Sequence, residues 1–394
     1  MIYADNAATT KMSPVALAAM LPALEDNYGN PSSLHSVGQH AAELLQSARE
    51  TMARCLNCKP REILFTSGGS EADNQALLSA AELGRLKGKK HIISTAFEHH
   101  AVLHSLKRLE KQGFEVTLLP VGPNGTVTAQ QVKEAIRSDT CLVTVMYANN
   151  EIGSILPIAE IGAVCREKGV LFHTDAVQAA GHLHINVNEQ NIDMLSLSGH
   201  KFHGPKGTGV LYARQGIPLT NIIEGGAQER GKRAGTENVP GIMGLAAALK
   251  EACDHIDENA AKVSALRDQL IAGLSQIPHS ALNGDPVHRL PGNVNFCFEG
   301  IEGESLLLLL DQAGICASSG SACTSGSLDP SHVLLAIGRP HEVAHGSLRL
   351  SLCEWNTQED VDHILKEVPR IVAYLRSISP VWKDLTSGKK QFML

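Results

Sequence analysis

The sequence predicts an α/β fold with a large, mostly parallel seven-stranded sheet and a smaller α+β domain toward the C-terminus. Seven short apolar segments alternate with amphipathic segments between residues 62 and 213, a pattern typical of βαβ units. The alternation stops in a glycine-rich, charged segment near 215–240. The chain has 394 residues, more than one hydrophobic core usually serves. We therefore expect a second domain from about residue 255 onward.

The predicted strands are short apolar runs bounded by polar residues or glycine. Because most of them are apolar throughout, they are expected to be buried on both faces, as in a parallel sheet covered by helices. Helical segments separate them, and one of these ends at Gly169, a residue type that commonly terminates helices. The strands are predicted over 62–67, 90–96, 115–121, 141–148, 170–176, 194–200 and 208–213.

The C-terminal part has a less regular pattern. A long helical stretch is predicted over roughly 240–277, and the segments after it mix strands and helices. The last residues, "TSGKKQFML", are polar and aperiodic, so the C-terminal tail is expected to be frayed.

Composition excludes several functional classes. Hydrophobic residues make up 43% of the chain and charged residues 19%, which fits a folded protein rather than a disordered one. The formal net charge of −7 does not suit a nucleic-acid-binding surface. The longest apolar run, "LLLLL" at 306–310, is far shorter than the roughly 18 residues of a membrane helix. A cytoplasmic protein without membrane or nucleic-acid partners is the simplest expectation.

The nine cysteines are an odd number without the dense framework of a disulfide-rich protein, so free thiols in a reducing compartment are expected. Cys55 and Cys58 form a C-x-x-C motif, but a zinc site would need a second pair at similar spacing. A redox pair stays open, although two residues at a helix end are the better interpretation. The sequence predicts no firm metal site.

Open α/β sheets bind ligands at the carboxyl ends of their strands, and two candidate residues lie at such ends. In "FTSGGSEADN", the glycine pair and the helix start could hold a phosphate, with Ser70 adding a hydroxyl. An ordinary serine-capped helix is the alternative. Asp175 follows an apolar run in "LFHTDAVQ". A carboxylate there needs a partner, either a ligand cation or the start of the next helix.

Three further motifs carry groups suited to catalysis. Lys201 in "SGHKFHGPKG" follows a strand and precedes a rigid turn, where partial desolvation would make it a nucleophile toward carbonyls. A solvated loop lysine is the alternative. His99 and His100 in "FEHHAV" point apart, so one of them could stack on an aromatic ligand. Arg349 in "SLRLSL" could clamp a carboxylate or form a surface ion pair.

These features form an ordered set: a phosphate cradle, a buried acid, a lysine and a distant arginine. The set matches pyridoxal phosphate, for which a lysine forms the Schiff base, an acid pairs with the pyridinium nitrogen and a helix end takes the phosphate. Cys323 stands apart, among small residues in "ASSGSACTSGS", whereas buried cysteines usually lie among large apolar side chains.

The chain resembles the cysteine desulfurases of the NifS/IscS type, which are fold-type I pyridoxal-phosphate enzymes related to class-V aminotransferases. The resemblance covers nearly the whole chain and is carried by "YADNAATT", "GNPSS", "TSGGSEADN", "NNEIG", "HTDAVQ", "SGHKFHGPKG", "RAGTENVP", "SSGSAC" and "SLRLSL". It implies a large cofactor-binding domain over 13–254 and a small domain made of 1–12 and 255–394. It also implies a mobile catalytic loop at about 316–332.

The resemblance implies a role for each matching position. Lys201 would carry the cofactor covalently, Asp175 would hold its pyridine nitrogen, Gln178 would bond its ring oxygen, and His99 would stack on the ring and move protons. Gly69, Ser70, Ser198 and His200 would line the phosphate, with Thr236 arriving from the other subunit of a homodimer. Asn150 and Arg349 would hold the substrate carboxylate, with Asn150 also near the ring.

Cys323 would be the nucleophile that takes sulfur from L-cysteine as a persulfide while alanine leaves. A flexible loop of serine and glycine would allow its thiol to attack the substrate sulfur inside a pocket and then to deliver that sulfur to an acceptor outside the pocket. The acceptor would be a protein such as an iron–sulfur scaffold, with which Cys323 could be a transient cluster ligand. Two positions depart from the family pattern: Ser70 stands where threonine is common, and Cys353 where glycine is usual.

Two other functions compete with this interpretation. A selenocysteine lyase, or another pyridoxal-phosphate-dependent C–S lyase, would use the same scaffold. A catalytically inactive scaffold that binds a cluster-assembly partner is a different class, and the presence of Lys201, Asp175 and Cys323 argues against it. The sequence does not identify the sulfur acceptor or its pathway.

Overall fold

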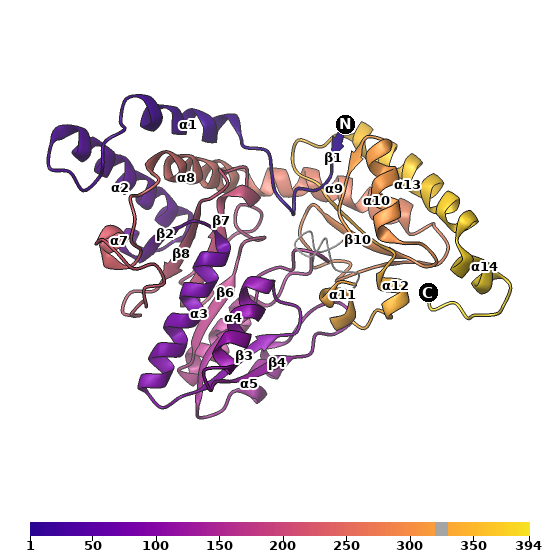
Figure 1. Ribbon diagram of the computed structural model, residues 1–394, viewed down its shortest axis with the longest axis horizontal. Helices are drawn as coiled ribbons and strands as arrows, with labels where there is room; N and C mark the ends of the chain where they lie inside the picture. The colour runs from indigo at the N-terminus through magenta and orange to yellow at the C-terminus, as the bar shows by residue number, and fades with distance from the viewer. Residues whose placement is uncertain (320–329) are drawn as a thin grey trace.

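A computed structural model describes residues 1–319 and 330–394 of the chain (Figure 1). Its largest element is a seven-stranded sheet, which confirms the predicted α/β fold. The strand β8 runs antiparallel to both of its neighbours, and the remaining neighbours pair in parallel. In spatial order the strands are β2 (Ile63–Thr66), β8 (Gly209–Ala213), β7 (Met194–Ser198), β6 (Leu171–Asp175), β5 (Thr140–Thr144), β3 (His91–Thr95) and β4 (Glu115–Leu119).

Helices cover both faces of this sheet. Successive strand residues point to opposite faces, so Ile63 and Phe65 join one hydrophobic core and Leu64 joins another. The first core packs under α2 (Ser36–Leu56), α5 (Ala129–Ala135), α6 (Ile158–Lys168) and α8 (Val239–Asp254), and the second under α3 (Gly69–Leu86) and α4 (His100–Glu110). The helix α1 (Pro14–Glu25) packs on α8, and α7 (Gln228–Gly231) and the short 3-10 turns η1 (Pro60–Glu62) and η2 (Gly199–Lys201) complete this part.

The C-terminal part has its own sheet and core. An antiparallel sheet of order β12 (Ser347–Ser351), β10 (Asn293–Phe298) and β9 (Ser280–Leu282) packs against α9 (Ile256–Leu274), α10 (Gly303–Gln312) and α13 (Gln358–Ile378). The N-terminal strand β1 (Ile2–Tyr3) pairs in parallel with β11 (Ile315–Cys316) and so joins this part. The remaining helices are α11 (His332–Ala336), α12 (His341–Ala344) and α14 (Pro380–Thr386). The domain boundaries at 12/13 and 254/255 stay a prediction.

Two local expectations were wrong. The helical stretch predicted over 240–277 is two helices, because the backbone breaks at His255 (φ −123°, ψ 14°). The C-terminal tail is packed rather than frayed. The backbone N–H groups of Met393 and Leu394 donate to the Glu299 carboxylate over 2.9 and 3.1 Å, and the Phe392 ring stacks on His279 with centroids 3.6 Å apart.

Within the described ranges, no helix combines the length and apolar character that crossing a bilayer requires.

Candidate active site

A pocket of about 240 Å³ opens at the carboxyl ends of β6 and β7. Parallel strands end together at one edge of a sheet, so residues that follow different strands meet there. Ten of the twelve predicted site residues line this pocket: Gly69, Ser70, His99, Asn150, Asp175, Gln178, Ser198, His200, Lys201 and Arg349. The geometry therefore gathers residues that lie up to 280 positions apart in the chain, although their individual roles stay predictions.

Lys201 ends the 3-10 turn η2, directly after β7. Its Nζ donates to the backbone oxygens of Ala7 and Ala8 over 2.6 and 2.7 Å. The N-terminal segment therefore lies across the pocket and fixes where the lysine amine sits.

Asp175 is the last residue of β6, and its side chain is buried. Its Oδ1 accepts a hydrogen bond of 2.9 Å from the Val177 N–H. Burial raises the pKa of Asp175 from the ordinary 3.8 to about 6, and the Lys201 charge opposes that rise. A buried carboxylate held this way in a pocket is well suited to a ligand cation, because a cation there would stabilise its charged form.

His99 and His100 point in different directions, as expected for adjacent residues. His99 caps α4, with its Nδ1 accepting from the Ala101 N–H at 3.1 Å, and its ring lines the pocket. Burial, with the Lys201 charge second, lowers the pKa of His99 to about 4, so its imidazole is neutral at neutral pH. His100 instead faces the ring of His332, with centroids 4.7 Å apart.

The start of α3 also lines the pocket, through Gly69 and Ser70. A Cβ at Gly69 would lie 2.5 Å from Val177 Cγ2, so glycine lets this helix start approach the loop after β6. The first N–H groups of a helix have no partner within it and attract anions. Ser70, Ser198 and His200 line the same pocket, and burial lowers the pKa of His200 to about 4.

Arg349 lies on β12 with its side chain 2% exposed, so the surface ion pair considered from the sequence is wrong. One guanidinium nitrogen donates to Asp5 Oδ1 over 3.0 Å and another to the Asn150 backbone oxygen over 3.2 Å. Its Nε has no hydrogen-bond partner among the described residues. A buried donor without a partner is costly, and a substrate carboxylate in the pocket could satisfy it.

Sequence reasoning did not identify several residues that build the site. Ala7 accepts from Gln178 Nε2 over 3.0 Å as well as from Lys201. Asp5 holds Arg349, and Asp73 lines the pocket close to Asp175. Burial and the Asp175 charge hold the pKa of Asp73 well above its ordinary value. The motif "YADNAATT" was the sequence signal that could have pointed to these N-terminal residues. The motif does not indicate which pocket residues they contact.

Two predicted residues do not line this pocket in the structure. Thr236 is exposed in the segment before α8, so a role at the partner subunit stays a prediction. Cys323 lies outside the described residues, as do the other residues of 320–329. The described residues on either side of that segment lie near the site. Ser318 pairs through its backbone with Arg349, and Ser331 donates to the Glu151 carboxylate, next to Asn150 in the chain.

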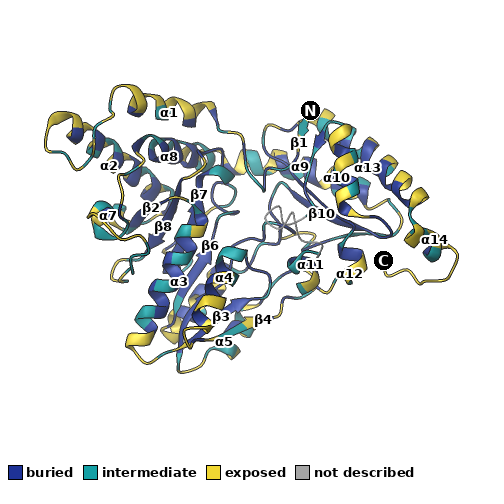
Figure 2. Cartoon of the chain, in the orientation of Figure 1, coloured by how far each residue is buried: buried dark blue, intermediate teal, exposed yellow. Residues whose placement is uncertain are grey.

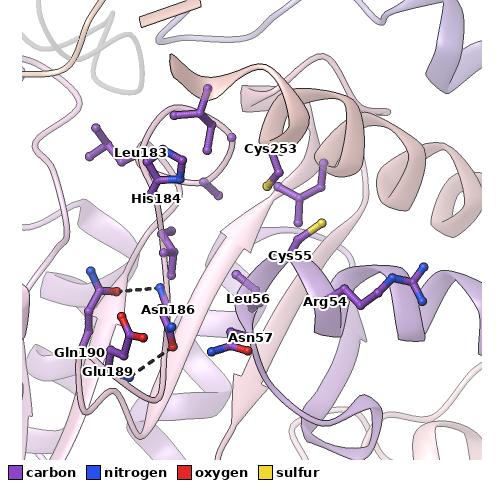
Figure 3. A pocket seen from close by; sticks show the side chains of 15 residues that line it. Arg54, Cys55, Leu56, Asn57, Leu183, His184, Asn186, Glu189, Gln190 and Cys253 are labelled. Carbon is purple, nitrogen blue, oxygen red and sulfur yellow. Dashed lines mark hydrogen bonds between the residues drawn. The ribbon is translucent and has the colours of Figure 1, made fainter. Parts of the chain in front are cut away.

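Two larger cavities lie elsewhere, but neither gathers a comparable set of lysine, acid and arginine. One, of about 840 Å³, lies beside the C-terminal tail. The other, of about 610 Å³, lies between α2 and the loop after β6 (Figure 3). There Cys55 faces Cys253 of α8, and a hydrogen bond from Cys253 lowers the pKa of Cys55. Cys55 belongs to the last turn of α2 and Cys58 follows its end, which confirms the helix-end interpretation of the C-x-x-C motif.

The residues of the main pocket fit pyridoxal phosphate. A buried carboxylate, a lysine amine, a neutral histidine ring and an open helix N-terminus face one cavity, which is the donor set that this cofactor requires. Gly69 leaves room at the helix start that a Cβ would fill.

Comparison with known proteins agrees with this geometry. The family model "Aminotransferase class-V" matches residues 2–364. The chain is 53% identical over 393 residues to "Cysteine desulfurase IscS" of Clostridium botulinum, covering 99% of both chains. It is 54% identical over 380 residues to the protein of the same name from Methanosarcina thermophila, covering 96% of this chain and 94% of the relative.

Solved structures show the same similarity. A "NifS-like protein" superposes with a TM-score of 0.89 at 38% identity, covering 95% of this chain and 100% of that one. The structure "SspA in complex with cysteine" superposes with a TM-score of 0.78 at 38% identity, covering 91% and 100%. The match over most of the chain and the identity to these relatives show that the chain belongs to the class-V aminotransferase family, among cysteine desulfurases of the NifS/IscS type.

Proposed function

We propose that this chain is a pyridoxal-phosphate-dependent cysteine desulfurase. The observation that carries the proposal is that Lys201, Asp175 and Arg349 line one pocket, although they come from a 3-10 turn, a parallel strand and the C-terminal sheet. Relatives more than 50% identical over nearly the whole chain carry that name. In the reaction, the sulfur atom of L-cysteine would move to the Cys323 thiol. The products would be alanine and a persulfide on Cys323, which together contain every atom of the two reactants.

The cofactor, when bound, supplies an electron sink that loosens the bond between the substrate carbon and sulfur. Lys201 would hold it covalently, Asp175 would hold its ring nitrogen in the cationic form, and Gln178 would bond its ring oxygen. The neutral His99 ring would stack on it. Gly69, Ser70, Ser198 and His200 would surround its phosphate.

The other residues of the pocket would orient the substrate and move protons. Arg349 and Asn150 would hold the cysteine carboxylate, because the buried guanidinium is anchored by Asp5 and retains an unpartnered Nε. His99 is neutral at neutral pH and can accept a proton there. A fixed carboxylate places the substrate sulfur in one position, which a thiol on a nearby segment can then reach.

Cys323 is well placed in the chain for this role. It is five residues beyond Ser318, whose backbone pairs with that of Arg349. Five residues span at most about 18 Å, and Arg349, with which Ser318 pairs, lines the pocket. After sulfur transfer, the persulfide would pass to an acceptor protein such as an iron–sulfur scaffold, with which Cys323 could transiently ligate the cluster.

We further propose a homodimer. The segment before α8 exposes Thr236 away from this chain's own pocket, so it could complete the phosphate site of a second copy. The helix α1 and the loop after it lie at the same end of the molecule as α7 (Figure 1), and parts of both are exposed (Figure 2). The exposed residues there include Leu17, Leu24, Tyr28 and Leu34, the last of them 94% exposed. A subunit interface would cover these side chains.

The compartment is also part of the proposal. All eight cysteines in the described ranges are free thiols, and a reactive thiol at Cys323 would need reducing conditions to turn over. Disulfides are rare in the cytosol, where thiols are kept reduced, and a cytoplasmic enzyme therefore fits best.

The test compares Lys201→Ala with Lys206→Ala, which changes an exposed lysine in the next turn of the chain. The purified Lys206→Ala protein should retain the visible absorption of bound cofactor and form alanine from L-cysteine. Lys201→Ala should lose both. A Lys201→Ala protein that keeps a borohydride-reducible cofactor link and forms alanine would refute the proposal, as would release of alanine from selenocysteine but not from cysteine.

A further inference from the structure

We propose a zinc site, separate from the cofactor pocket, formed by His203, Cys353 and Glu354. The ligand atoms of these three residues all lie within 4.8 Å of one another. They come from two distant parts of the chain, since His203 follows η2 and the other two follow β12.

His203 is held in the orientation that a metal ligand needs. Its Nδ1 donates to the Lys11 backbone oxygen over 2.8 Å, which leaves Nε2 as the ring nitrogen that could bind a metal. This is the arrangement of metal-binding histidines, which donate their other N–H to a carbonyl or carboxylate. The residue is 6% exposed, and Nε2 has no hydrogen-bond partner among the described residues. A buried ring nitrogen therefore faces Cys353 and the Glu354 carboxylate, whose Oε1 lies 3.3 Å from it.

The backbone of His203 is fixed as firmly as its ring. Its N–H donates to Thr10 Oγ1 and its carbonyl accepts from the Ser13 N–H, both over 2.9 Å. Its φ of 63° is in the left-handed region, which non-glycine residues seldom adopt and in which asparagine, aspartate and histidine are enriched.

Cys353 and Glu354 are held by the turn after β12. The Cys353 N–H donates to Asn356 Oδ1 over 2.9 Å, and Cys353 is 6% exposed. The Glu354 backbone oxygen accepts from Lys262 Nζ over 2.6 Å, while its side chain is 26% exposed and reaches solvent. The site therefore has a buried sulfur, a buried nitrogen and an oxygen at its mouth.

The distance between His203 and Glu354 suits a shared metal as well as a direct contact. His203 Nε2 and Glu354 Oε1 are 3.3 Å apart, longer than most N–H···O hydrogen bonds. Zinc bonds of about 2.0–2.3 Å at tetrahedral angles place neighbouring ligand atoms roughly 3.3–3.7 Å apart. A direct ion pair requires a doubly protonated imidazole. Although burial opposes it, contacts with Cys353 and Glu354 raise the pKa of His203 to about 10 in the metal-free protein, so a metal would have to displace the Nε2 proton. A cation between the two atoms satisfies both lone pairs without that proton.

The donor types select the metal. A thiolate, an imidazole and a carboxylate form a mixed set that suits Zn²⁺, and zinc sites with three protein ligands keep a fourth position for water. A cavity of about 40 Å³ touches His203, Cys353 and Glu354, enough to hold one water molecule. On binding, the Cys353 thiol would release its proton to solvent.

The position suggests what the metal would do. His203 is two residues after Lys201, and Cys353 is four residues after Arg349. The cavity is also lined by Asn259, Ala260 and Val263 of α9, at the junction of the two parts of the molecule (Figure 1). A bound zinc would join the segment that carries the cofactor lysine to the strand that carries the substrate arginine.

The test loads the cofactor-containing enzyme with Zn²⁺, removes the excess by dialysis, and measures bound zinc together with its X-ray absorption. We expect one zinc per chain, with one sulfur ligand and the remainder nitrogen or oxygen. Cys353→Ser and His203→Asn should each weaken zinc binding by more than about 100-fold, beyond the 10- to 100-fold that loss of an outer-shell partner costs. His203→Asn keeps a residue that tolerates positive φ, so the fold should persist.

Two control variants separate this site from other thiols. Cys253→Ser breaks the Cys55–Cys253 pair, and Cys323→Ser removes the loop thiol; both should bind zinc as the parent does. Two sulfur ligands per zinc would place the metal at the Cys55–Cys253 pair and overturn the proposal. So would an enzyme that binds less than one zinc per chain, or zinc that is retained in Cys353→Ser or in His203→Asn.

Discussion

Replacing Asp175 with asparagine should stabilise the cofactor-free protein while weakening its hold on the cofactor. Burial raises the pKa of this carboxyl from 3.8 to about 6. Above pH 6 the carboxylate is therefore charged in both states, and its charge is less stable in the folded protein than in the solvated unfolded chain. One pKa unit corresponds to 1.36 kcal/mol. The buried charge therefore costs about 3 kcal/mol at pH 8, and asparagine removes that cost.

The sign follows from the direction of the shift. A carboxyl whose folded pKa is raised binds more protons in the folded state between pH 3.8 and 6, so its contribution to stability falls as pH rises through that window. The Asp175→Asn substitution should thus raise the free energy of unfolding by about 3 kcal/mol at pH 8 and by about half of that at pH 5. For a unit of 150–250 residues this corresponds to a rise in Tm of up to roughly 10 °C.

Calorimetry of the cofactor-free proteins at pH 8 and pH 5 measures this effect, and equilibrium dialysis measures cofactor affinity. Asp193→Asn is a matched control, because Asp193 is also buried but accepts a hydrogen bond of 2.7 Å from Arg214. Removing a paired carboxylate leaves a charge without its partner, so this control should lower Tm. If Asp175→Asn had an unchanged or lower Tm at pH 8, or a gain that did not depend on pH, the assigned electrostatics would be wrong.

Three further outcomes are expected. Arg349→Lys should lower kcat/KM for L-cysteine by roughly 10- to 100-fold, mainly through KM. The single ammonium of lysine would replace a forked guanidinium whose charged hydrogen bonds contribute about 1.5–3 kcal/mol. Unchanged steady-state kinetics would count against this prediction. Cys323→Ser should bind the cofactor and L-cysteine, visible as a shift in cofactor absorption, yet release no alanine; alanine formation at the parent rate would exclude Cys323 as acceptor. Sedimentation should show a dimer at assay concentration, and a fully active monomer would contradict the partner role of Thr236.

The sheet could be predicted because its signal is local. Most strands of the large sheet are apolar runs, and several residues that line the pocket follow such a run or open the next helix. Asp175, Lys201 and the start of α3 at Gly69 were found this way, since the carboxyl ends of neighbouring parallel strands meet in space. The break at His255 has no such signal, because neither glycine nor proline interrupts the helical pattern there. It marks the point at which the chain passes from one core to the other.

Contacts across long sequence separations could not be predicted in the same way. Lys201 is held by the carbonyls of Ala7 and Ala8, and Arg349 by Asp5. Backbone carbonyls carry no residue-type signal, and a periodic pattern does not specify which distant segment crosses a pocket. The packed tail depends on the Phe392 ring meeting His279 and on hydrogen bonds from Met393 and Leu394 to Glu299, tertiary contacts that no local pattern indicates.

The central claim is that sulfur leaves L-cysteine at this pocket and moves to Cys323. The direct measurement treats the enzyme with a single equivalent of L-cysteine, quantifies alanine, and locates added sulfur by mass spectrometry of the digested protein. We predict one alanine per active site and one extra sulfur atom on the peptide that contains Cys323. Sulfur added to Cys55, Cys58 or Cys353 with Cys323 unmodified, or consumption of cysteine without alanine, would contradict the account.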